Sequence, residues 1–176
     1  MKQLVTQRLR IIPLTKDQLL LLEKQDRSEV LKQLGLSDTD LKISAGESFR
    51  KELDNAYPHI CRMIDRNPEY FEFCTHWWMI LQNTCVGGIG FAGPPDEQGV
   101  VMIGYYIDKR YENLGFATEG LGAMTDFAFQ NNQVRSIIAD TLPDGLASQR
   151  VLIKTGFRNM GRAEEGIRFR LDRSFK

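Results

Sequence analysis

The first part of the chain carries a strand-like pattern followed by a helical one. Apolar and polar residues alternate around Leu9 and Ile11, and the alternation stops at Pro13, which predicts a short strand. From residue 15 to residue 35, apolar residues recur at helical spacing, and Thr15 is of a type that favours helix N-termini. The pattern therefore predicts one helical run over residues 15–35.

A second helical stretch is predicted over Glu47–Arg66. Pro58 lies inside it and must kink or split the helix, because proline removes a backbone hydrogen bond. Asn67-Pro68 then marks a turn. The apolar side of this stretch consists of Phe49, Leu53, Ile60 and Ile64.

From residue 70 the chain is mainly strand-like. Residues 117–131 and 147–155 have helical spacing, and Asn83-Thr84 has the composition of a hairpin turn. No repeat, low-complexity tract or linker interrupts the chain, so one mixed α/β domain over residues 1–176 is predicted. Strands are expected over residues 76–82, 85–91, 100–107 and 135–141, with two more closing the chain.

Composition indicates an ordinary globular protein. The 23 basic residues balance the 23 acidic ones, which disfavours a nucleic-acid partner. The longest apolar stretches, Leu19–Leu22 and Trp77–Leu81, are too short to span a bilayer, and residues 1–4 show no secretory signal. We therefore expect a cytoplasmic protein with no nucleic-acid or membrane partner.

The cysteines and histidines form no recognisable site. Cys61, Cys74 and Cys85 make no C-x-x-C pair and have no histidine at zinc-ligand spacing. We interpret them as free thiols of a reducing compartment that pack as small apolar residues. His59 and His76 lie in no nucleophile or metal motif, so we expect structural or surface roles and no metal.

The most informative segment, residues 110–120, joins a predicted strand to an amphipathic helix. The first N–H groups of a helix lack partners and the helix dipole is positive there, so such a junction can bind phosphate. Gly115 gives access to the backbone, and Asn113 is the non-glycine type that best tolerates positive φ. Thr118 adds a hydroxyl and Arg110 a full charge. The alternative is an ordinary helix cap after a strand.

Two common phosphate-binding motifs are absent from this segment. The nucleoside-triphosphate version requires Gly-Lys-Ser/Thr at the helix start, and the dinucleotide version requires Gly-x-Gly-x-x-Gly. A second segment, residues 147–157, reads Ala-Ser-Gln-Arg-Val-Leu-Ile-Lys-Thr-Gly-Phe. Neither segment alone is specific, but both occur in this chain, in this order.

Together they resemble the GNAT superfamily of acyl-CoA-dependent N-acyltransferases, especially its ribosomal-protein N-acetyltransferase-like branch. That family has a cofactor motif, Gln/Arg-x-x-Gly-x-Gly/Ala followed by aromatic-Ala-Thr-Glu, and a second motif, Ala-Ser-x-x-Val-Leu-x-Lys-x-Gly-Phe. Residues 6–10 and 103–105 also look like the branch. The resemblance implies an α/β (α+β) fold with a mostly antiparallel sheet of about seven strands and about four or five helices. The matching residues are Arg110, Gly115, Phe116, Ala117, Thr118 and Glu119 in the first motif and Ala147, Ser148, Val151, Leu152, Lys154, Gly156 and Phe157 in the second.

The resemblance also implies how acetyl-CoA is held as a co-substrate. The strands that end near Ile107 and Thr141 splay apart, and the pantetheine arm lies between them. A backbone N–H near Tyr106 or Ile107 stabilises the oxyanion. The residues implied to contact the cofactor are Ile107, Arg110, Asn113, Leu114, Gly115, Phe116, Ala117, Thr118 and Ser148.

The resemblance assigns the catalytic groups in part. It places the Ser148 hydroxyl near the thioester sulfur as an acid, although Ser148 can also cap the helix that begins there. Relatives often carry Glu where this chain has Met102, whose thioether cannot accept a proton. Tyr105 can join a water relay or simply pack as an aromatic residue. The general base is therefore unassigned. The chain departs from the branch at two further positions: Asn113 stands where the branch usually has glycine, and Gly145 where it often has asparagine.

The predicted function is transfer of the acetyl group of acetyl-CoA to a primary amine by direct attack in a ternary complex. The alternative, kept open by Met102, is a CoA-binding sensor or scaffold without catalysis. The acceptor, a small-molecule amine or a protein N-terminus, is expected against the loops around residues 26–75. A homodimer would use an exposed strand edge or the Trp77-Trp78 pair.

Overall fold

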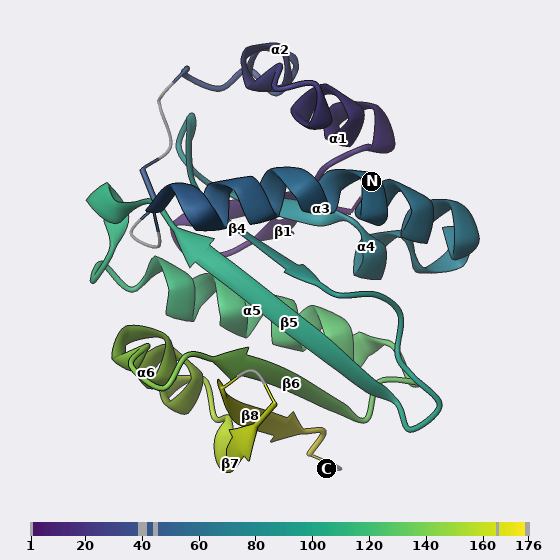
Figure 1. Ribbon diagram of the computed structural model, residues 1–176, viewed down its shortest axis with the longest axis vertical. Helices are drawn as coiled ribbons and strands as arrows, with labels where there is room; N and C mark the ends of the chain where they lie inside the picture. Colours follow the sequence, from purple (N-terminus) through teal and green to yellow (C-terminus); the bar gives the residue numbers. More distant parts are fainter. Residues whose placement is uncertain (1, 39–41, 44–45, 165, 175–176) are drawn as a thin grey trace.

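The computed structural model describes residues 2–38, 42–43, 46–164 and 166–174, with backbone alone at residues 46–50. Its centre is an eight-stranded sheet in the order β1-β2-β3-β4-β5-β6-β8-β7 (Figure 1). Neighbouring strands are antiparallel except β5 and β6, which run parallel. The mixed, mostly antiparallel α/β fold is confirmed, with eight strands and six α-helices in the described part of the chain.

Most predicted elements of the second half agree with the observed ones to within one residue at each end. The strands are β1 (Leu4–Val5), β2 (Leu9–Pro13), β3 (His76–Leu81), β4 (Thr84–Phe91), β5 (Val100–Ile107), β6 (Ser136–Thr141), β7 (Arg158–Ala163) and β8 (Gly166–Asp172). The helices are α1 (Lys16–Glu23), α2 (Arg27–Gln33), α3 (Gly46–Arg66), α4 (Phe71–Cys74), α5 (Phe116–Gln130) and α6 (Leu146–Lys154), with 3₁₀ turns η1 (Pro68–Tyr70) and η2 (Lys109–Tyr111).

The sheet separates two hydrophobic cores, and β3 shows why. Trp77 and Met79 point to the face that α5 and α6 cover, whereas Trp78 and Ile80 point to the face that α1, α2 and α3 cover. All four side chains are fully buried, because alternate residues of a strand face opposite sides of the sheet. The tryptophan pair proposed as a dimer contact therefore belongs to the two cores and offers no surface.

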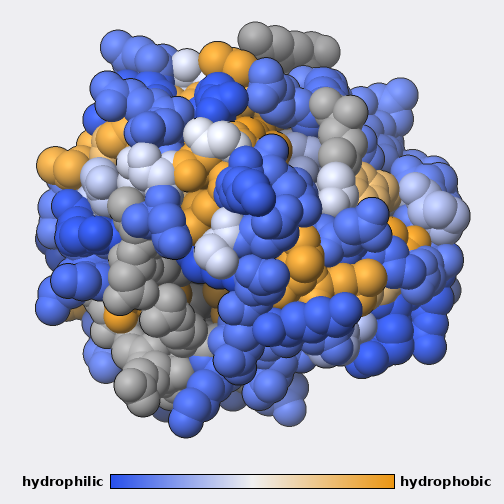
Figure 2. Space-filling view, turned by 90° about the horizontal axis from the view of Figure 1, so that it is seen from above, coloured by the Kyte–Doolittle hydropathy of each residue, from blue (hydrophilic) through white to orange (hydrophobic). Residues whose placement is uncertain are grey.

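The helices α1 and α2 form one end of the molecule, and α6 lies with β7 and β8 at the other (Figure 1). Figure 2 looks onto the α1–α2 end, where hydrophilic side chains cover most of the surface and hydrophobic groups form small patches. Leu19 of α1 and Val30 of α2 are buried beneath them. Within the described residues, no helix is both long and apolar enough to cross a membrane.

The helical run predicted over residues 15–35 is in fact two helices. Gln25 has a left-handed φ of 62°, which breaks the run after α1. The Asp26 side chain then caps α2 by accepting a hydrogen bond from the N–H of Glu29. A local cap signal in the middle of an apolar pattern therefore outweighed the continuous periodicity.

Two other local predictions can be compared with the structure. Of the two effects expected of Pro58, a kink or a split, the split does not occur, because α3 continues from Gly46 to Arg66. The side chain of Phe49 lies outside the described residues. The hairpin turn between β3 and β4 is Gln82-Asn83 rather than one residue later. Gln82 takes the left-handed conformation that the tight turn requires, with φ of 55°.

The parallel pair β5–β6 separates part-way along its length. Only three residue pairs join the two strands, from Val100↔Ser136 to Met102↔Ile138. Beyond that point β5 continues to Ile107, paired with β4, and β6 continues with β8. The strand ends therefore diverge as expected, and they leave a gap at the carboxyl end of β5.

Candidate active site

The loop between β5 and α5 has the backbone conformation predicted for an anion cradle. Asn113 and Gly115 are both left-handed, with φ of 60° and 85°. Gly115 is the N-cap of α5 and carries no side chain that could occupy the helix N-terminus. The N–H groups of residues 116–118 begin the helix and have no intrahelical partner, so they can bind an anion.

A cavity of about 370 Å³, here called the loop cavity, opens beside this loop. Arg110 and Leu114, which we expected to contact the cofactor, are not among its lining residues. Two cations that the sequence analysis did not assign, Arg150 and Lys154, do line it. They lie one turn apart on α6, a spacing that could have identified them. The predicted residues that line the cavity are Tyr105, Ile107, Asn113, Gly115, Phe116, Ala117, Thr118 and Ser148.

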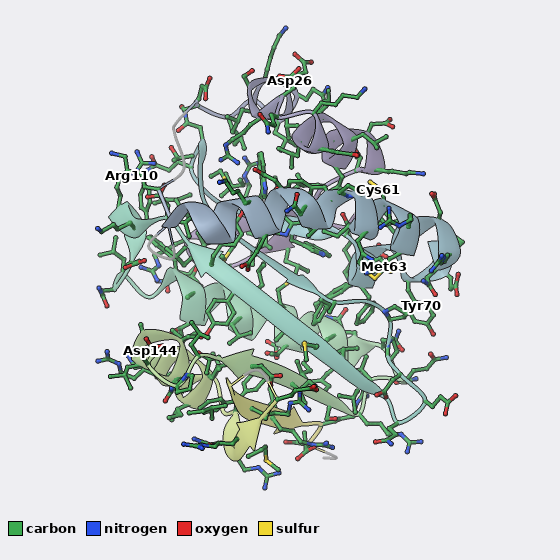
Figure 3. All side chains as sticks on the ribbon, viewed as in Figure 1. Asp26, Cys61, Met63, Tyr70, Arg110 and Asp144 are labelled. Atoms are coloured by element: carbon green, nitrogen blue, oxygen red, sulfur yellow. The ribbon has the colours of Figure 1, made fainter. Side chains whose placement is uncertain are left out.

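Arg110 pairs with a buried carboxylate instead. Its Nε and Nη2 atoms lie 2.9 and 2.7 Å from the two oxygens of Asp108, whose side chain is 0% exposed. Burial alone would raise the pKa of Asp108, but hydrogen bonds from Arg110 and from the Lys42 N–H outweigh it and lower the pKa to about 2. Figure 3 shows Arg110 at the periphery, past the end of β5. The guanidinium therefore stabilises η2.

Arg8 is the cation that holds the loop. It donates from Nη1 to the Leu114 carbonyl, at 2.9 Å, and from Nε to Glu119, at 2.7 Å. Its guanidinium also lies 4.4 Å from the centre of the Phe116 ring. A Cβ on Gly115 would approach Arg8 Nη2 to 3.3 Å. Arg8, which precedes β2 in the bend after β1, thus braces the cradle from a part of the chain more than 100 residues away.

The ladder between β4 and β5 decides which amides face the gap. The Met102 carbonyl accepts from the Ala92 N–H, and the Asp108 N–H donates to the Val86 carbonyl. Even-numbered residues of β5 therefore bond to β4, and the N–H groups of odd-numbered residues point the other way. Of the two backbone donors expected to stabilise an oxyanion, Ile107 faces the gap and Tyr106 does not.

Ser148 and Tyr105, the two predicted catalytic residues, are in contact. The Tyr105 hydroxyl oxygen lies 3.0 Å from Ser148 Oγ and donates to the Ser148 carbonyl at 3.2 Å. Burial raises the pKa of Tyr105, so its phenol keeps its proton at neutral pH. Gly145 is the N-cap of α6, which begins at Leu146, so Ser148 lies inside the helix and does not cap it.

A second cavity of about 460 Å³, here called the sheet cavity, lies on the other side of this contact. It shares Tyr105, Tyr106 and Ser148 with the loop cavity. Met102 lines it and is 36% exposed. Most of its lining is apolar or glycine. The remaining lining residues are Leu53, Ile60, Thr75, His76, Gly88, Gly90, Phe91, Ala92, Ile103, Gly104, Ala139 and Asp140.

The lining of the sheet cavity includes two titratable residues, Asp140 and His76, for which the sequence predicted no role in the site. Asp140 of β6 accepts from Arg168 Nε and Nη2 at 2.9 and 2.7 Å. His76 of β3, expected to be structural or on the surface, is buried and lines the cavity. No local motif marks either residue, because strand pairing alone brings them to the site. In the described part of the chain, no three His, Cys, Asp or Glu residues are placed to bind a metal.

The sequence matches that of known acetyltransferases. The sequence profile of the acetyltransferase (GNAT) domain matches residues 8–158. The chain belongs to the GNAT acetyltransferase family. It is 30% identical over 137 residues to the uncharacterized N-acetyltransferase YjdG of Bacillus subtilis (strain 168), covering 76% of each chain. It is 36% identical over 67 residues to the probable N-acetyltransferase YjcK of the same organism, covering 38% of this chain and 37% of YjcK.

Solved GNAT structures share the fold. RimL, the ribosomal L7/L12 alpha-N-protein acetyltransferase solved in complex with coenzyme A, has a TM-score of 0.66 at 14% identity, covering 97% of this chain and 98% of RimL. A putative ribosomal-protein-serine acetyltransferase from Vibrio cholerae has a TM-score of 0.63 at 21% identity, covering 98% of each chain. These structures share the fold of this chain, and as a member of the GNAT family the chain is an N-acetyltransferase by family.

Proposed function

We propose that this enzyme transfers the acetyl group of acetyl-CoA to a primary amine by direct attack in a ternary complex. The observation that carries the proposal is the meeting of two chemically different cavities at Tyr105, Tyr106 and Ser148. One cavity has a helix N-terminus and two cations, and the other has a largely apolar lining. Such a pair can bring an anionic thioester and an uncharged amine together.

The loop cavity fits a CoA thioester. The cradle at Gly115 offers backbone N–H groups to a pyrophosphate, and Arg150 and Lys154 add positive charge along α6. The pantetheine arm would lie where β5 and β6 are no longer paired, beyond Met102↔Ile138. Acetyl-CoA supplies an activated acyl group, and the chain's own part is to orient it and to stabilise charge.

Three groups at the junction would assist the chemistry. The Ile107 N–H faces the gap and can donate to the oxyanion that forms on the thioester carbonyl. Ser148 can supply a proton to the leaving sulfur. The Tyr105 phenol, protonated at neutral pH and 3.0 Å from Ser148 Oγ, can return a proton to that serine.

The acceptor is a primary amine on a small molecule or at a protein N-terminus. The sheet cavity has room for a short, mostly apolar body, and its described lining includes no lysine or arginine that would attract an anion. The fold shared with ribosomal-protein acetyltransferases supports a protein N-terminus. We infer a cytoplasmic location, which the three free, buried cysteines support.

A ligand series tests the donor. Acetyl-CoA and CoA should raise the melting temperature and ATP and NAD should not, because a ligand at a hundred times its Kd stabilises the native state by about 2.7 kcal/mol. Release of free thiol from acetyl-CoA, measured with peptide amides that begin with Ser or Ala and with small amines, tests turnover. CoA binding without turnover on any amine would support a CoA-binding sensor or scaffold instead. Absence of CoA binding would exclude both the acetyltransferase and the sensor or scaffold.

A further inference from the structure

Three glycines of the strands β4 and β5 line the sheet cavity, and they place no side chain in it. On the face toward α3, β5 presents Met102, Gly104 and Tyr106 in alternation, and Gly88 and Gly90 of β4 pair with Tyr106 and Gly104. A Cβ built on Gly104 meets no atom within 4 Å. At Gly104 the floor of the cavity is therefore backbone, and His76 and Tyr106, which also line the cavity, are 8% and 9% exposed.

His76 lies against this floor and uses the room that Gly88 leaves. A Cβ on Gly88 would come within 2.5 Å of His76 Nε2 and 2.7 Å of Tyr106 Cε1. The imidazole stacks on the Tyr106 ring, with centroids 5.8 Å apart and planes 10° apart. His76 Nε2 lies 3.3 Å from the Tyr106 hydroxyl oxygen. The pair is thus held in one geometry at the wall of the cavity.

Both members of the pair are uncharged at neutral pH. Burial, helped by the positive charge of Arg27, lowers the pKa of His76 to about 4. Burial also raises the pKa of the Tyr106 hydroxyl well above its usual value. The imidazole therefore offers a lone pair while the phenol keeps its proton. The charged or titratable groups that face the pair are Arg27 from α2, Asp54 and Tyr57 from α3, Cys85 from β4, and the Asp140–Arg168 ion pair across the cavity.

We propose that His76 and Tyr106 take up the proton that the acceptor amine loses, a role that Met102 cannot perform. The inference rests on the proposed acetyl transfer. The amine nitrogen bonds to the carbonyl carbon, its N–H proton passes to the Tyr106 oxygen, and the phenol proton passes to His76 Nε2. The C–S bond breaks, and the sulfur takes a proton from solvent through Tyr105 and Ser148. The imidazolium releases its proton to solvent, so one proton moves from amine to thiol.

Burial keeps the His76 imidazole unprotonated throughout the physiological range, because its pKa is lowered to about 4, so its lone pair is available to accept a proton. An imidazolium in a dry site is unstable, so it passes the proton on rather than holding it.

Asp140 is the competing acceptor, because it is the one carboxylate in the described lining of the sheet cavity. Both of its oxygens already accept hydrogen bonds from Arg168, at 2.9 and 2.7 Å. A proton that arrived there would have to displace an ion pair. His76 differs from Asp140 in this respect. When the imidazole proton is on Nδ1, the Nε2 lone pair can accept a hydrogen bond from the Tyr106 hydroxyl, which lies 3.3 Å away.

The first test does not depend on turnover. In the His59→Gln protein, which retains His76 as its sole histidine, imidazole NMR signals are followed while CoA is added and then 2-phenylethylamine or a peptide amide that begins with Ser. Binding of CoA followed by a shift of the His76 signals on addition of amine is the expected result. CoA binding with unmoved His76 signals at 10 mM of both amines overturns the inference alone, whereas failure to bind CoA counts against the proposed function.

The second test separates kcat from KM for the same two amines. His76→Gln should lower kcat about a hundredfold at pH 7.5 and leave CoA affinity unchanged, because glutamine accepts a hydrogen bond but not a proton. Tyr106→Phe keeps the ring stack and should lose a similar factor, which covers a failure of the first variant to fold. His59→Gln, an exposed histidine, is the matched control.

Two results of the kinetic test would overturn the proposal. The first is a kcat within twofold of the parent for both His76→Gln and Tyr106→Phe. The second is a loss confined to Asp140→Asn, which would assign the proton to the carboxylate. Restored turnover in His76→Ala on addition of imidazoles, with a rate that depends on the pKa of the added base, would support proton transfer over a purely structural role.

Discussion

The two cavities on either side of the Tyr105–Ser148 contact are built in opposite ways. The loop cavity is lined from two continuous segments, residues 105–118 and 147–154, and it relies on backbone amides and cations. The sheet cavity draws on residues from 53 to 148, and it relies on positions where side chains are missing. If the loop cavity holds the donor and the sheet cavity the acceptor, as we propose, donor recognition depends on local backbone shape and acceptor recognition on tertiary packing.

The largest effect should come from disrupting the cradle. Gly115→Val places a β-branched residue at a φ of 85°, where strain costs about 1–3 kcal/mol, and moves its Cβ toward Arg8. We expect CoA affinity to fall at least about a hundredfold in calorimetric titration, since both the amides and the access to them are disturbed. The control is Gly122→Ala in the same helix, where a Cβ meets nothing within 4 Å and CoA affinity should not change. If Gly115→Val binds CoA as tightly as that control, the loop does not hold the donor.

Removal of the Arg110 side chain should affect the fold and not the donor site. Arg110→Ala leaves the Asp108 carboxylate buried without its guanidinium, at a cost of roughly 2 kcal/mol in the free energy of unfolding, reduced because Arg110 is 40% exposed. CoA affinity should stay within threefold. A large loss of CoA affinity with unchanged stability would instead put Arg110 on the pyrophosphate.

The same pair predicts a pH dependence. The folded pKa of Asp108 is about 2, below its ordinary value of 3.8, so ionised Asp108 contributes stability above about pH 4. That contribution is lost as the pH falls from about 4 to 2. The gap in unfolding free energy between the parent and Arg110→Ala, measured by urea titration, should therefore narrow over this interval. An equal gap at pH 7 and pH 2.5 would contradict the assignment.

A side chain added at Gly104, in the sheet cavity, should weaken binding of the acceptor amine and leave CoA binding unchanged. Gly104→Val adds a residue type that suits strands and projects it into open space, so the fold should persist. We expect the KM for the amine to rise about tenfold, with CoA affinity unchanged, because the side chain occupies part of the sheet cavity. Gly104→Ala should give a smaller rise. Unchanged amine kinetics in both variants would place the acceptor elsewhere.

The smallest effect is expected from restoring the carboxylate that relatives carry. If His76 and Tyr106 already take the proton, Met102→Glu should change kcat by less than about threefold. The melting temperature should be measured beside it, because the new carboxylate borders an apolar cavity. A gain of a hundredfold or more would show that the parent lacks a working base.

Much of the fold was predictable because its determinants are local. Strand-like composition between turn residues placed β3, β4, β5 and β6 to within one residue, and helical spacing did the same for α5 and α6. The errors occurred where one residue overrode a periodic pattern, as Gln25 did between α1 and α2 and Gln82 did in the hairpin turn. A left-handed glutamine carries no compositional signal, whereas Asn113 and Gly115 belong to types that favour that conformation.

The sequence by itself determined the family and the loop conformation at Asn113 and Gly115, because contiguous motifs encode that backbone shape. The contact between Ser148 and Tyr105, by contrast, came from the tertiary structure. Only the tertiary structure decided that Arg8 braces the loop while Arg110 pairs with Asp108, and that His76 faces Tyr106 across a glycine floor. The Arg8 and His76 contacts join residues from 30 to 111 positions apart, and they depend on strand order and on the side of the sheet each residue faces. Arg110 and Asp108 are close in sequence, but their pairing depends on the burial of Asp108 in the folded chain. Pairing across a sheet is set by the whole packed core, which no single segment specifies.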